Sequence, residues 1–108
     1  MSSALKEMLP DLIRDLQGEL IRVGRGGVAD QLGEASLSRW EYDQDADVAY
    51  LFLGDVAERE SVYAAAAETI SFYDELGVNV DLDGRGHLLG IEILGAARVV
   101  SRLKDGTV

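Results

Sequence analysis

The chain has 108 residues, no cysteine, a hydrophobic fraction of 47% and a formal net charge of −10, values that fit one globular domain with an acidic surface. The excess of acids argues against binding to nucleic acids or anionic membranes, because both depend on Lys and Arg. The lack of cysteine excludes disulfides and thiolate metal sites. The N-terminus is charged, unlike a secretion signal. For both reasons we expect a cytoplasmic protein.

Residues 5–23 have the periodicity of an amphipathic helix. The apolar side chains fall on one stripe, formed by Leu5, Leu9, Leu12, Ile13, Leu16, Leu20 and Val23. Proline is costly inside a helix but favourable at its first position, so we predict either a kink at Pro10 or a main helix that starts there. The glycine-rich stretch 24–27 ends the helix. Val28–Leu32 is predicted to form a short second helix that ends at Gly33.

From Ser36 the apolar period changes to two, which indicates β-structure. Trp40 and Tyr42 belong to a first strand, and the acidic stretch 43–47 is predicted to be a turn. Val48–Leu53 is apolar on both faces and is predicted to be a strand covered on both sides.

The stretch from 55 to 69 is difficult to assign. Its alanine run favours a helix, whereas the residues that follow favour a strand. We place a strand near Glu68–Tyr73 and leave Ala57–Ala67 without a predicted structure.

The sequence DLDGRGHLLGIE has the spacing of a calcium-binding loop. Asp81, Asp83, Gly86 and Glu92 stand at its positions 1, 3, 6 and 12. Such a loop needs helices on both sides, whereas both flanks here have the period of strands. The fifth position, which should supply an oxygen ligand, is Arg85. We therefore predict a β-hairpin and no metal site.

The predicted hairpin has a four-residue loop in which Gly86 takes up a left-handed backbone. Gly90 and Glu92 are expected on its outer face, with Gly90 opposite Asn79 and with Glu92 placed to accept hydrogen bonds from a neighbouring strand or subunit. The predicted register pairs Leu82 with His87, Val80 with Leu89 and Val78 with Ile91.

His87 is the only histidine, so any histidine-based catalysis would depend on it. In the predicted register its side chain faces inward near Leu82, which favours a structural imidazole. Asp81 and Asp83 alternate with core residues as solvent-facing residues do, and nothing nearby indicates the burial that tunes carboxylates for acid–base chemistry. We predict no catalytic, cofactor-binding or metal-binding residues, and a protein that is not an enzyme.

Three segments, YDQDADVAYL, GVNVDLDGRG and LLGIEILGA, resemble the domain-of-unknown-function 2283 family of small bacterial and archaeal proteins over roughly residues 40–97. The resemblance implies a compact antiparallel sheet, but no activity, cofactor or catalytic residue, because none is established for the family. Two features depart from its pattern: the N-terminal helical segment is extra, and Gly54–Leu76 is several residues longer. The matching residues are Tyr42, Asp43, Ala46, Asp47, Tyr50, Gly77, Asp81, Asp83, Gly90, Ile91, Glu92, Ile93 and Leu94.

The sequence as a whole predicts a single α+β domain, with a helical segment over 1–35, an antiparallel β region over 36–97 and a C-terminal tail over 98–108. The N-terminal helix, together with the short second one, packs on a sheet of four or five strands. One helix covers only one face of a sheet, and so we expect a homo-oligomer, most simply a two-fold dimer.

Three functions remain open at this point. The first hypothesis is a non-catalytic module for self-association or protein interaction. The second is an acidic, antitoxin-like partner that neutralises a basic protein. The third is a small enzyme that depends on carboxylates.

Overall fold

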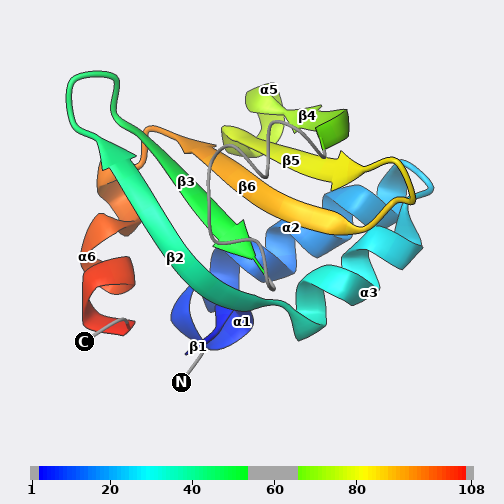
Figure 1. The fold of residues 1–108 in the computed structure, drawn as a ribbon, viewed down its shortest axis with the longest axis horizontal. Coiled ribbons are helices and arrows are strands. Elements are labelled where there is room, and N and C mark those ends of the chain that lie inside the picture. The colour runs from blue at the N-terminus through cyan, green and yellow to red at the C-terminus, as the bar shows by residue number, and fades with distance from the viewer. Residues whose placement is uncertain (1–2, 54–65, 107–108) are drawn as a thin grey trace.

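The computed structural model describes residues 3–53 and 66–106, which form helices packed on one antiparallel sheet (Figure 1). This architecture confirms the predicted α+β class. The elements in chain order are β1 (Ser3–Ala4), α1 (Leu5–Met8), α2 (Pro10–Arg22), α3 (Gly26–Glu34), β2 (Ser36–Asp43), β3 (Val48–Leu53), β4 (Ala66–Phe72), α5 (Tyr73–Leu76), β5 (Val78–Asp83), β6 (Leu88–Leu94) and α6 (Ala97–Gly106).

The strands lie in the order β1-β2-β3-β6-β5-β4, and every neighbouring pair is antiparallel. Two local hairpins, β2–β3 and β5–β6, are joined through the pairing of β3 with β6, and β4 extends the sheet beyond β5. The five longer strands, β2 to β6, correspond to the predicted sheet of four or five strands. The two-residue strand β1, at the edge beside β2, was not predicted.

The N-terminal helical stripe breaks at Leu9, whose φ of −131° and ψ of 62° lie outside the helical region. Pro10 then occupies the first position of α2, as one of the two predictions required. The helix α3 is longer than the predicted Val28–Leu32, since it continues through Gly33. None of the helices in the described residues is long and apolar enough to cross a membrane.

The helices cover one face of the sheet, which we call the inner face. In Figure 1, α1 and α2 lie behind the sheet, α3 lies below β6 and α6 lies at one end of the sheet. Leu51 of β3 is fully buried there, and the α2 residues Leu16 and Leu20 are equally inaccessible. The sheet residues that join them in the hydrophobic core are Leu37, Ala49, Leu53, Phe72, Val78, Val80, Leu82, Ile91 and Ile93.

Two helices were not predicted. α5 is a single turn between β4 and β5, and it ends at Gly77, which has a φ of +65°. α6 occupies most of the stretch 98–108 that the sequence analysis treated as a tail. Its residues Val99, Val100 and Leu103 are buried against the core. Their spacing is that of a helix with one apolar face, so this signal was present in the sequence.

The β5–β6 hairpin is confirmed, but its predicted register is wrong by two residues at Val78 and Val80 and by one at Leu82. Val80 pairs with Ile91 and Leu82 with Leu88, and the amide of Asp83 donates to the carbonyl of His87 over 2.9 Å. The loop therefore has three residues instead of four. Gly86 has the expected left-handed backbone, with a φ of +81°. A bulge places the additional residue in β6, as loops that end in a left-handed glycine allow.

The segment Ala57–Ala67 lies largely outside the described residues. The strand predicted near Glu68–Tyr73 is present as β4, which begins at Ala66 and ends at Phe72.

Candidate functional site

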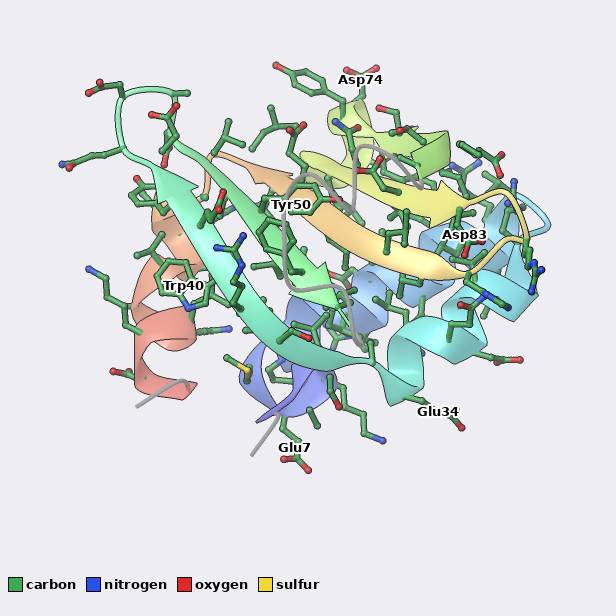
Figure 2. All side chains as sticks on the ribbon, in the orientation of Figure 1. Glu7, Glu34, Trp40, Tyr50, Asp74 and Asp83 are labelled. Carbon is green, nitrogen blue, oxygen red and sulfur yellow. The ribbon has the colours of Figure 1, made fainter. Side chains whose placement is uncertain are left out.

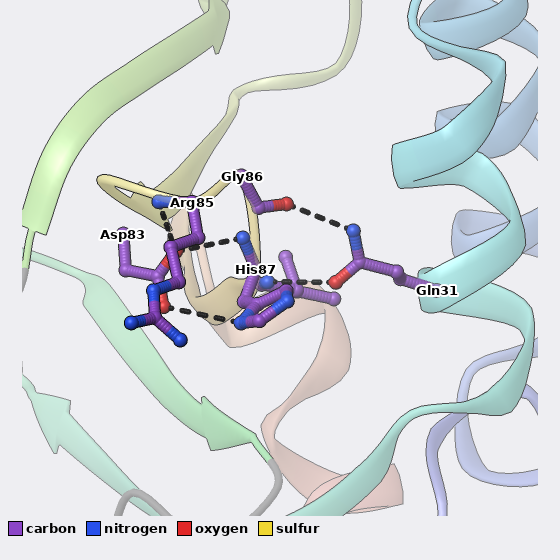
Figure 3. Close-up of polar contacts among 6 residues, drawn as sticks. Gln31, Asp83, Arg85, Gly86 and His87 are labelled. Carbon is purple, nitrogen blue, oxygen red and sulfur yellow. Dashed lines mark hydrogen bonds and ion pairs between the residues drawn. The ribbon is translucent and has the colours of Figure 1, made fainter.

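The tip of the β5–β6 hairpin is built around the carboxylate of Asp83 (Figure 3). Its Oδ1 accepts hydrogen bonds from the backbone amides of Arg85 and His87, each over 2.8 Å. These bonds, first that from His87, lower the pKa of the Asp83 carboxyl, although its partial burial acts in the opposite direction. The carboxylate thus stabilises the turn in the way that Asp side chains commonly do.

Gln31 attaches this hairpin tip to α3 (Figure 3). Its Nε2 donates to the carbonyl of Gly86 and its Oε1 accepts from the amide of Leu88, both over 2.8 Å. One side-chain amide therefore bonds to the backbone of β6 and its loop as a neighbouring peptide group would. Gln31 could not be identified from the sequence, because no local pattern relates it to a hairpin that lies 55 residues away.

His87 is not directed inward, contrary to the prediction. Its side chain is 67% exposed, and its Nδ1 lies 3.4 Å from Oδ2 of Asp83. The prediction failed because the three-residue loop places Leu88, not His87, opposite Leu82.

The face of the sheet opposite the helices, which we call the outer face, carries a second group of polar contacts. Figure 2 shows Tyr50 on this face, in front of β3 and β6. The residues that the register places on it include Arg39, Glu41, Val48, Tyr50, Phe52, Thr69, Ser71, Asn79, Asp81, Gly90, Glu92 and Leu94.

Asp81 is the centre of a hydrogen-bond network that spans the outer face. The hydroxyl of Tyr50 donates to its Oδ2 over 2.7 Å, and the hydroxyl of Thr69 donates to its Oδ1 over 2.6 Å. The donors come from β3 and β4, which lie on opposite sides of the β6–β5 pair. Both oxygens of this carboxylate are thus engaged in linking strands.

A second contact joins β5 to β6. Asn79 is directly opposite Glu92, and its Nδ2 donates to Oε1 of Glu92 over 2.9 Å. The expectation that Glu92 accepts a hydrogen bond from a neighbouring strand is therefore confirmed. The amide oxygen of Asn79 is buried and has no hydrogen-bond partner among the described residues.

Gly90 lies on the outer face as expected, but it is opposite Asp81 and not Asn79. A Cβ atom at this position would lie 2.5 Å from both Cε1 and the hydroxyl oxygen of Tyr50. The ring therefore rests directly over the glycine, and this contact holds the Tyr50 hydroxyl beside Asp81.

Phe52 adds an apolar part to the outer face, next to the network. It is only 1% exposed, its ring centroid lies 4.9 Å from that of Tyr50, and Cζ of Arg39 lies 4.3 Å from it. Arg39 also forms an ion pair with Glu41 over 3.0 Å. A guanidinium in this position is attracted by the negative face of the aromatic ring.

The acidic turn between β2 and β3 has a structural role through Asp47. Its Oδ1 accepts from the hydroxyl of Tyr42 and from the amide of Ala97, the first residue of α6, each over 2.8 Å. The bond to Asp47 raises the pKa of the Tyr42 hydroxyl. Asp43 supports the same turn, because its carboxylate accepts the amides of Asp45 and Ala46.

The residues with calcium-loop spacing do not converge on one point. Asp81 bonds to two hydroxyl groups, Asp83 to the amides of its own turn, and Glu92 to Asn79. Across residues 3–53 and 66–106, no group of three acidic or histidine side chains is arranged to hold a metal ion. This hairpin thus has the residue spacing of a calcium loop, but each of its acids has a separate partner.

A family model described as a protein of unknown function, DUF2283, matches residues 39–96. This chain belongs to that family. The match runs from within β2 to just past the end of β6, so the network on the outer face and the Asp47 turn both lie inside the DUF2283 region. The helices α1, α2, α3 and α6 all lie outside it. No curated protein and no solved structure matches the chain.

Proposed function

We propose that this DUF2283 protein is a non-catalytic, cytoplasmic interaction module that associates with a second copy of itself. The observation that carries the proposal is the edge strand β4. Within the described part of the chain, β4 is paired with β5 on one side and with no strand on the other. An exposed strand edge offers a row of unpaired backbone donors and acceptors to another strand.

The sequence of β4 supports this role. It contains neither proline nor lysine, the residues with which edges are commonly protected from pairing, and Thr69, Ile70 and Phe72 favour strands. All of its residues except Ile70 and Phe72 are exposed. Such a strand is suited to pairing with another chain.

The contacts on the outer face favour a binding role over catalysis. A catalytic acid or nucleophile must be free to reach a substrate, whereas Asp81 is occupied by two hydroxyl groups and Glu92 by Asn79. His87 is at the hairpin tip with Asp83, and its contacts do not include Asp81 or Glu92. These observations weigh against the carboxylate enzyme.

The test of self-association is the molar mass in solution. Light scattering after size-exclusion chromatography at micromolar concentration should give about twice the 11.7 kDa chain mass. A monodisperse monomer at millimolar concentration would contradict the proposal. Leu51→Asp is not an informative variant for this test, because Leu51 is fully buried beneath the helices and its replacement should unfold the chain.

The second candidate is an acidic partner of a basic protein, and the distribution of charge favours it. Arg14, Arg22, Arg25 and Arg39 are all paired with acids of the same chain, which leaves the excess of acids uncompensated. Salt separates the two candidates. Self-association of a chain with a net charge of −10 should strengthen as salt screens the repulsion, whereas capture of a basic protein from the native lysate should weaken.

A further inference from the structure

The edge strand β4 has a regular part and an irregular part. Its register with β5 shifts between Ala66 and Glu68, and from Glu68 to Phe72 it is continuous. A strand that meets the edge of β4 would therefore find a regular backbone only over Glu68–Phe72, which has Ile70 at its centre.

The side chains of this regular part suit a partner that has the same sequence. An antiparallel pairing of two copies centred on Ile70 places Ile70 opposite Ile70 and Thr69 opposite Ser71. Ile70 is half-buried and packs against the core on the inner face, so the second isoleucine would cover its exposed part. The hydroxyl residues would meet on the outer face, where Thr–Ser pairs are favourable.

The charge at this edge is also compatible with a second copy. Glu68 is the only charged residue in the regular part, and Arg25 binds it with two contacts of 2.8 Å, Nη1 to Oε2 and Nη2 to Oε1. A bidentate pair of this kind compensates the carboxylate locally. Two copies can then approach along β4 without bringing an uncompensated acid into the contact, although each carries a net charge of −10.

We infer that two copies join through β4 in an antiparallel pair whose two-fold axis passes beside Ile70, so that their sheets form one continuous sheet with all helices on the same side. This inference rests on the proposed self-association and specifies its contact. A pairing centred on Thr69 would instead place Glu68 against Ile70 and bring the two Glu68 carboxylates closer together.

The absence of cysteine makes a cross-linking test possible. In the full chain, Ile70→Cys should give a disulfide-linked dimer under mild oxidation, because opposed residues in an antiparallel pair have Cα atoms about 4.5 to 5.5 Å apart, within the range of a disulfide. Ser71→Cys is the matched control on the same strand. Its two cysteines would be diagonal to each other, at about 7 to 8 Å, and should cross-link far more slowly.

The possible results have distinct meanings. Faster cross-linking of the Ile70→Cys variant supports the inferred pairing, whereas equal rates or faster cross-linking of Ser71→Cys would overturn it while leaving self-association intact. A wild-type chain that is monomeric throughout would remove both the inference and the proposed function.

Hydrogen exchange of the wild-type chain provides a test without substitution. Raising the concentration should protect amides in Glu68–Phe72 at least tenfold but leave those of β3 unchanged, and unchanged β4 amides in a proven dimer would overturn the inference.

Discussion

At the scale of single residues, the contact between Tyr50 and Gly90 determines the geometry of the outer face. Atoms of the tyrosine ring lie where a side chain at position 90 would begin. Any larger residue must displace the ring, and with it the hydroxyl that donates to Asp81. The glycine is thus required for space, since its backbone does not have a positive φ.

Gly90→Ala should therefore lower the free energy of unfolding by about 1–3 kcal/mol, the usual cost of inserting atoms into a packed site. Gly84→Ala is the matched control, because a Cβ atom there has nothing within 4 Å. Urea melts measure both. In a Tyr50→Ala background the cost of Gly90→Ala should largely disappear, and a cost that persisted would show that the ring is not its cause.

Gly86 illustrates the other reason for a glycine. Space is not limiting there, but its φ of +81° is unfavourable for a residue with a side chain, above all a β-branched one. We expect Gly86→Val to destabilise the protein by about 1–2 kcal/mol more than Arg85→Ala. Equal midpoints of the two variants in urea would contradict this explanation of the turn.

At the scale of elements, the sequence predicted those segments whose apolar pattern is complete within the segment itself. The β3 bounds, the start of α2 at Pro10 and the β5–β6 hairpin could be predicted because period, proline and glycine act locally. The register of the hairpin could not, because it depends on a bulge at Leu89 and a three-residue loop that alternation alone does not reveal. Beyond the bulge the shift is two residues, which preserves the inward and outward assignments, so alternation there is equally satisfied by both registers. Before the bulge the shift is one residue, which is why the inward assignment of His87 was wrong.

The candidate site was predictable only in part. Its acids were identified from the calcium-like spacing, and Glu92 was correctly expected to bond with a neighbouring strand. The donors Tyr50 and Thr69 were not paired with Asp81, because they come from strands whose order in the sheet cannot be derived from the sequence. The role of Asp47 was missed for a similar reason, since the helix α6 that it caps was itself not predicted.

The link between α3 and the hairpin gives a prediction at this scale. Gln31→Ala removes two hydrogen bonds to the backbone and should cost about 2 kcal/mol of unfolding free energy. Gln44→Ala, at an exposed position in the turn between β2 and β3, should have little effect. Amide exchange should localise the change, with faster exchange at Leu88. An unaltered rate at Leu88 would show that Gln31 does not hold the hairpin tip.

At the scale of the whole molecule, stability should depend on pH at both ends of the range. Asp83 and Glu68 have lowered pKa values, Asp83 through backbone amides and Glu68 through Arg25. Their contribution to the free energy of unfolding is complete above the ordinary carboxyl pKa of about 4. It is lost as the pH falls through the lower pKa values that these groups have in the folded state. Tyr42 has a raised pKa, so its contribution is complete below about pH 10 and is lost as the pH rises further.

The urea midpoint should therefore fall on acidification below about pH 4 and again above about pH 10. Glu68→Gln should make the acid-side decrease shallower, and Tyr42→Phe should do the same on the alkaline side. Neither variant should change the decrease at the opposite end. A midpoint that did not depend on pH at either end would contradict the assigned ion pair and hydrogen bonds.

The strand order also has a consequence for how the chain folds. The hairpins β2–β3 and β5–β6 are each closed by a short turn and can form early, whereas the central pairing of β3 with β6 joins strands far apart in the chain. The entropy of closing that large loop must be lost before the central contacts form, so this step should limit the folding rate. Because loop-closure entropy changes only logarithmically with length, extra residues between β3 and β4 should slow folding very little. The fold should therefore tolerate variation in the length of this connection.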